Sequence, residues 1–164
     1  MISLFRRAEE TGWEYREAWY DHPAGELVVH HGRVGANGTL TAEKVPAEEA
    51  EALLESFAER CEADGYRSPG EDESHDVVIA YPLKGQEPAA SEQRNADTVH
   101  TAVLTTLAWR GLGVLTDPEL QARDGGMALV MTARTLHRRK ALDAVRSAVK
   151  STDVPASKIR ASTA

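Results

Sequence analysis

The stretch VVHHGRVGANGT, residues 28–39, decides the fold of the first part of the chain. Apolar and polar residues alternate from Leu27 to Arg33, a pattern typical of a β-strand with two different faces. We expect Gly35, Asn37 and Gly38 to supply the positive φ angles that a tight reversal needs. The stretch therefore predicts a strand that runs into a sharp turn, with an arginine between two glycines.

The neighbouring segments predict an antiparallel sheet covered by a helix. Strand patterns cover residues 2–8, 13–20 and 39–45. A helix begins at Pro46, which suits a first helical turn, and Gly65 is a suitable C-terminal cap. Its apolar residues recur at helical spacing and predict a face packed on the sheet: Ala50, Leu53, Leu54, Phe57 and Cys61.

Taken in order, these features resemble the WGR domain over residues 1–68. The matching series is an aromatic strand at residues 13–20, GRVG at residues 32–35, Gly38-Thr39, and an amphipathic helix followed by DGY at residues 64–66. This small domain occurs in DNA-damage-activated poly(ADP-ribose) polymerases and in assorted bacterial proteins. His31 stands where the family has the tryptophan of its name.

The resemblance implies a non-catalytic recognition module. In the polymerases the tryptophan packs against sugar at a DNA end, and the arginine links the domain to its neighbours. It therefore implies that Arg33 makes an inter-domain or ligand contact, with His31, Gly32 and Gly35 beside it. Arginine forks suit interfaces and anions. A structural arginine bonded to backbone carbonyls is the equally weighted alternative.

The rest of the chain predicts a second α+β domain. Residues 69–74 are an acidic linker, and residues 75–164 have the order β-α-β-β-α-β of a ferredoxin-like fold. The turn DGG at residues 124–126 suits a hairpin. The expected strands are residues 76–83, 113–116, 127–133 and 158–160, and the expected helices are residues 91–111 and 136–150.

Charge is distributed unevenly along the chain, whose net charge is −7. Residues 1–74 hold 7 Lys or Arg against 17 Asp or Glu, whereas residues 75–164 hold 12 against 9. Phosphate binding needs basic charge, so the first half is a poor nucleic-acid surface. Arg138, Arg139 and Lys140 lie in the one segment where phosphate could plausibly bind, although such a run is most often a solvated helix face.

No pattern of catalytic, metal or cofactor binding stands out. Cys61 is the single cysteine, and we expect it to be an inert core thiol. His30 and His31 are neighbours in a strand and point to opposite faces, so we expect no metal site and take His30 as a surface residue. With neither a signal peptide nor a long apolar run in view, we expect a cytoplasmic protein.

The sequence therefore favours a non-catalytic adaptor that recognises a protein partner or, weakly, a nucleic acid. One alternative is a DNA-binding accessory protein that uses the basic helix, for which affinity falls steeply with salt. Another is a ferredoxin-like domain that binds a small molecule in a pocket near Tyr81 and His100. A homodimer through sheet edges is also possible.

Overall fold

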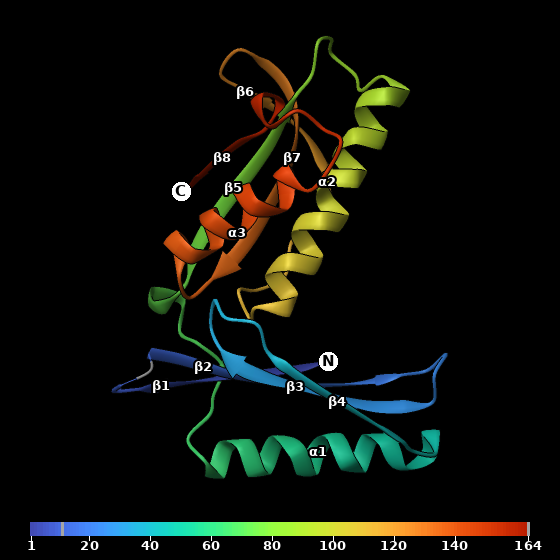
Figure 1. Cartoon of the computed structure of the whole chain (residues 1–164), viewed down its shortest axis with the longest axis vertical. Helices are drawn as coiled ribbons and strands as arrows, with labels where there is room; N and C mark the ends of the chain where they lie inside the picture. The colour runs from blue at the N-terminus through green and yellow to red at the C-terminus, as the bar shows by residue number, and fades with distance from the viewer. Residues whose placement is uncertain (11, 164) are drawn as a thin grey trace. The chain divides into compact units, whose positions relative to one another are not determined.

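The computed structural model describes residues 1–10 and 12–163 and separates the chain into two compact units. Unit 1 is Met1–Glu71 and unit 2 is Asp72–Ala164, and both combine a four-stranded antiparallel sheet with helix (Figure 1). The α+β class expected from the sequence is confirmed. None of the helices within the described ranges is long and apolar enough to cross a membrane.

The sheet of unit 1 is a meander in which each strand pairs with the next. Antiparallel neighbours in chain order need only short connections, as the turn residues predict. In the register, Ala18 pairs with both Ile2 and Val29, so these three residues share one face. The strands are β1 (Ile2–Ala8), β2 (Gly12–Asp21), β3 (Glu26–Arg33) and β4 (Thr39–Lys44).

Helix α1 (Ala47–Ala63) packs on that face of the sheet. Its periodic apolar residues meet the strands, and Cys61 is only 1% exposed, which confirms the expected core thiol. Gly65 has a φ of +83° just past the helix end, a conformation that favours glycine. The core cluster is Leu4, Ala18, Phe57, Cys61 and Tyr66.

Unit 2 has its four strands in the order β6-β7-β5-β8, all antiparallel. Helices α2 and α3 pack against each other. Val77, Ile79 and Met131 are fully buried in its core. The elements are β5 (His75–Pro82), α2 (Ala90–Trp109), β6 (Glu119–Arg123), β7 (Gly126–Thr135), α3 (Arg138–Lys150) and β8 (Arg160–Thr163), with short 3-10 turns at Glu71–Glu73 and Ala156–Lys158.

Two strand predictions in unit 2 are wrong. Residues 113–116 form only an isolated bridge, from Leu115 to Ala133, and the second strand is β6, beyond Pro118. Gly113 has a φ of +105°, which interrupts an extended run. Residues 156–158 form a 3-10 turn instead of an edge strand, which shifts the last strand to residues 160–163.

Candidate functional site

Arg33 and His31 both lie near the end of β3 and are exposed. They alternate with Gly32, so both side chains project from the sheet face that α1 covers elsewhere. Together with Gly32 they line a cavity of about 370 Å³ in unit 1, beside Arg16 and Tyr66. The structure therefore brings three of the four predicted unit 1 site residues into one cavity, and Gly35 is outside its lining.

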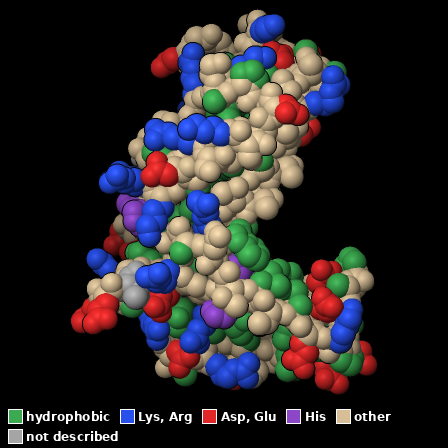
Figure 2. Space-filling model, viewed as in Figure 1, with side chains coloured by type: hydrophobic (Ala, Val, Ile, Leu, Met, Phe, Trp, Pro, Cys, Tyr) green, Lys and Arg blue, Asp and Glu red, His purple; other side chains and the backbone are tan. Residues whose placement is uncertain are grey.

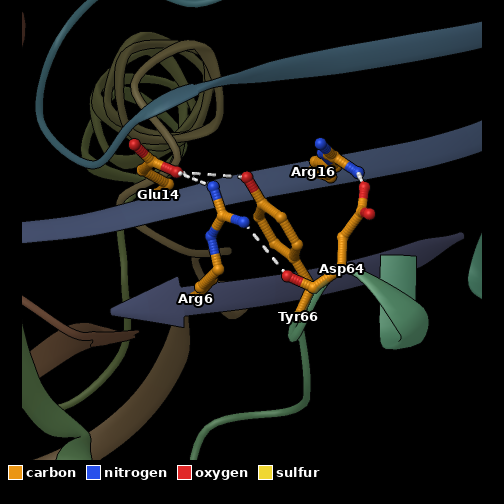
Figure 3. Close-up of polar contacts among 5 residues, drawn as sticks. All are labelled: Arg6, Glu14, Arg16, Asp64 and Tyr66. Carbon is orange, nitrogen blue, oxygen red and sulfur yellow. Dashed lines mark hydrogen bonds and ion pairs between the residues drawn. The ribbon is translucent and has the colours of Figure 1, made fainter. Parts of the chain in front are cut away.

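One wall of this cavity is Tyr66, which follows the C-terminal end of α1 (Figure 3). The guanidinium carbons of Arg6 and Arg16 lie 4.6 and 4.3 Å from the centre of the Tyr66 ring. At these distances the ring face attracts both cations. The backbone of Phe5 also bonds that of Arg67 in both directions, at 2.8 Å, and this pairing fixes the segment that carries Tyr66.

Carboxylates hold the same two arginines in place. Arg6 donates to the Glu14 carboxylate at 2.8 Å and to the Asp64 carbonyl at 3.0 Å, and Arg16 donates to the Asp64 carboxylate at 2.5 Å. Tyr66 adds a hydrogen bond to Glu14 at 3.2 Å. The hydrogen bond that Arg6 donates to Glu14 raises the pKa of Arg6. Arg6 and Arg16 therefore have a structural role, because their contacts connect the strands to the segment that carries Tyr66.

Arg33, unlike Arg6 and Arg16, has no carboxylate partner in the described part of the chain. Its guanidinium forms no hydrogen bond or ion pair with any residue in the described ranges, although it lies beside this network. That Arg33 makes an inter-domain or ligand contact stays a prediction. Sequence reasoning missed Arg16 and Tyr66, because they lie 50 residues apart and meet only when α1 folds onto the sheet.

Two positions in the loop after β3 favour glycine for different reasons, Gly35 for its backbone conformation and Gly38 for lack of space. Gly35 has a φ of +88°, and Ala36 donates to the Arg33 carbonyl at 3.0 Å to close the turn. Neither Asn37 nor Gly38 has a positive φ, so that prediction is wrong. A Cβ on Gly38 would instead lie 2.0 Å from the Tyr15 hydroxyl and 2.2 Å from Nε2 of His30.

Those two side chains belong to a buried polar network on the sheet face away from α1. The Tyr15 hydroxyl lies 3.0 Å from Nε2 of His30, and Nδ1 of His30 lies 3.1 Å from Glu17. Ser3 donates to the other Glu17 oxygen at 2.9 Å. Burial, assisted by the Glu17 charge, raises the pKa of Tyr15 to about 12. His30 is 3% exposed, so its interpretation as a surface residue is wrong.

The predicted basic residues of unit 2 form a separate cluster. Arg138, Arg139 and Lys140 occupy the first turn of α3 and are exposed, and Figure 2 shows Lys and Arg side chains gathered around this helix. Cations at a helix N-terminus oppose the helix dipole. Burial, followed by the charge of Lys140, lowers the pKa of the preceding His137.

The remaining histidines do not form a metal site within the described ranges. No group of three metal-ligating side chains occurs there. His22 packs edge-on against Tyr20 at 4.9 Å, and His100 in α2 lies 3.7 Å from the Asp117 carboxylate. Searches against protein-family models, curated proteins and solved structures found no match to this chain. A function can therefore be inferred only from the residues and geometry of each unit.

Proposed function

We propose that this chain is a non-catalytic recognition protein whose unit 1 is a WGR-like module. Arg33, with His31 beside it, binds a carboxylate on an acidic segment of a partner protein. The observation that carries this proposal is the difference between two arginines that line the same cavity. Arg16 donates a hydrogen bond to Asp64, whereas the guanidinium N–H groups of Arg33 bond to no residue in the described ranges. Arginine in that state is suited to a carboxylate because its fork makes two parallel hydrogen bonds.

Two features support the choice of a protein partner over a nucleic acid. The first 74 residues carry ten more acidic than basic side chains, a balance that repels phosphate backbones. His31, in place of the tryptophan of the WGR motif, offers less stacking area for a sugar or base. A local cationic spot on an acidic unit suits a short acidic peptide better than an extended polyanion.

The test is fluorescence anisotropy of the full chain with a labelled peptide that carries two adjacent glutamates in an otherwise neutral sequence, and with a labelled DNA duplex that has a free end. We expect the peptide to bind at low salt and Arg33→Gln to weaken it roughly tenfold, as for a lost charge-assisted hydrogen bond. The matched control is Arg7→Gln, which removes the same charge from an exposed position outside the cavity lining. Equal effects of the two substitutions would refute the site.

A second candidate function is nucleic-acid binding through unit 2. Its support is the exposed first turn of α3 with Arg138, Arg139 and Lys140. We further propose that unit 2 is ferredoxin-like, because β7 lies between β5 and β6 in the sheet as a split βαβ unit requires. In the same titration, duplex binding that falls steeply with salt and is abolished by charge reversal at Arg138 and Arg139 would favour this function.

A further inference from the structure

Unit 2 contains a second cavity, of about 560 Å³, at the end of β5. It lies between the loop after β5, the first two turns of α2 and the segment that leads into β8. Its volume is within the range of small-molecule sites, roughly 300–1,000 Å³. The residues that line it are Tyr81, Pro82, Lys84, Gly85, Glu87, Ala89, Ser91, Glu92, Asn95, Ser157, Lys158 and Arg160.

Three of the lining residues are cations, against two glutamates, Glu87 and Glu92. Lys84 lies in the loop after β5, whereas Lys158 and Arg160 lie two residues apart where the last 3-10 turn leads into β8. None of the three forms an ion pair within the described ranges. Like charges that converge on one cavity repel one another, and a bound anion relieves that repulsion. Lys84 is far from the other two cations in the sequence, so no single basic run accounts for the meeting of all three.

One of the two lining glutamates, Glu92, is already held by backbone hydrogen bonds. Glu92 is 8% exposed and accepts hydrogen bonds from the backbone N–H of Lys84 at 3.1 Å and of Ala89 at 3.0 Å. These two bonds lower the pKa of Glu92, and the charges of Lys84 and Lys158 add to that effect. Glu92 thus holds the loop that carries Lys84 in position.

The neutral polar groups of the lining also favour an anion. Asn95 donates to the Tyr81 hydroxyl at 3.1 Å, which leaves the Tyr81 proton available for a further acceptor. Ser91 supplies another hydroxyl to the same cavity. Hydroxyl donors of this kind fix the orientation of a charged ligand.

We propose that this cavity binds a small organic anion with two or more negative charges, held by Lys84, Lys158 and Arg160. The site is independent of the Arg33 cavity, because every residue that lines it belongs to unit 2. The ligand chemistry is that of a phosphoryl group or a pair of carboxylates. Either group accepts several charge-assisted hydrogen bonds at once.

Calorimetric titration of the full chain at low salt with pyrophosphate and with succinate tests the proposal and separates the two sources of charge. We expect saturable binding of at least one probe, and amide shifts in the nitrogen-resolved NMR spectrum centred on residues 84–95. Lys158→Ala should weaken binding roughly tenfold. Arg94→Ala, an equal charge loss on α2 outside the lining, should change it less than twofold.

Three outcomes would overturn the proposal: no saturation by either probe, equal weakening by Lys158→Ala and Arg94→Ala, or shifts centred on the first turn of α3. Circular dichroism of both variants establishes that a lost signal reflects binding and not unfolding. Loss of peptide binding by Arg33→Gln has no bearing on this result, so the two proposals fail separately.

Discussion

The cations around Tyr66 in unit 1 and those in the first turn of α3 in unit 2 are used in opposite ways. Arg6 and Arg16 are fixed by two carboxylates and one aromatic ring. Arg138 and Arg139 project from a helix terminus whose dipole opposes them. The net charge of each part, acidic for the first and basic for the second, does not reveal this difference.

The comparison separates cations that neighbouring carboxylates hold in place from cations that project away from the protein. In unit 1 the fixed pair builds a wall, and Arg33 remains available beside that wall. In unit 2 the exposed Arg138 and Arg139 lie in a first helical turn, where their charge opposes the helix dipole. The predictions below test each side of this contrast.

The largest effect on stability is expected from Gly38→Ala, which adds a methyl group in the loop after Arg33. The new Cβ would lie 2.0 Å from the Tyr15 hydroxyl and 2.2 Å from His30, so the buried network must separate. Overpacking of this kind, with a lost buried hydrogen bond, should lower the free energy of unfolding of unit 1 by roughly 3 kcal/mol. Urea unfolding followed by tryptophan fluorescence measures it.

Gly85→Ala is the control for that experiment, because its nearest heavy atom would lie at an ordinary 3.7 Å. A second comparison uses Tyr15→Phe together with Gly38→Ala. The double variant removes the clashing hydroxyl of Tyr15 and should recover part of the stability lost by Gly38→Ala. A Gly38→Ala protein as stable as the Gly85→Ala protein would contradict the described packing.

A smaller effect is expected from Glu14→Gln, which weakens the wall around Tyr66. The substitution removes the charge that accepts hydrogen bonds from Arg6 and Tyr66, so unit 1 should lose about 1 kcal/mol of unfolding free energy. High salt should reduce the difference from the unsubstituted protein. Glu55→Gln on the exposed side of α1 is the matched control, and an equal loss there would show that Glu14 has no special role.

Local patterns allowed much of this architecture to be predicted. The alternation from Leu27 to Arg33 and the apolar spacing before Gly65 both lie within one element, where a periodicity is visible. Strand β6 was missed because its five residues include just two apolar ones and are mostly exposed. An edge strand of this kind is defined by its pairing with β7 and not by its own composition.

The site was predicted less completely, because its contacts are long-range. Arg33 was selected from its place between glycines, and that choice needed no tertiary information. The burial of His30 depends on its pairing opposite Glu17 and on the approach of Gly38, neither of which a strand pattern shows. The second cavity joins residues near 84, 92 and 158, a separation that no motif spans.

A pH effect is expected at the start of α3. Burial and the Lys140 charge lower the pKa of His137, so the unfolded chain binds a proton more readily than the folded one. The stability that this group contributes is therefore complete above its ordinary pKa and is lost as the pH falls below about 6.5. His137→Gln should therefore show a shallower loss of melting temperature between pH 7 and pH 5 than the unsubstituted protein does.

The smallest effect, and one of opposite sign, is expected from Arg139→Gln. Removing a cation from the first turn of α3 relieves its repulsion with the helix dipole, so unit 2 should gain about 0.3–0.5 kcal/mol of unfolding free energy. Thermal unfolding at low salt measures the gain, and 0.5 M salt should reduce it. Arg146→Gln, farther along the same helix, should give no such gain. A loss of stability from Arg139→Gln would mean that Arg139 is structural, as Arg6 and Arg16 are, and the contrast between the two units would no longer hold.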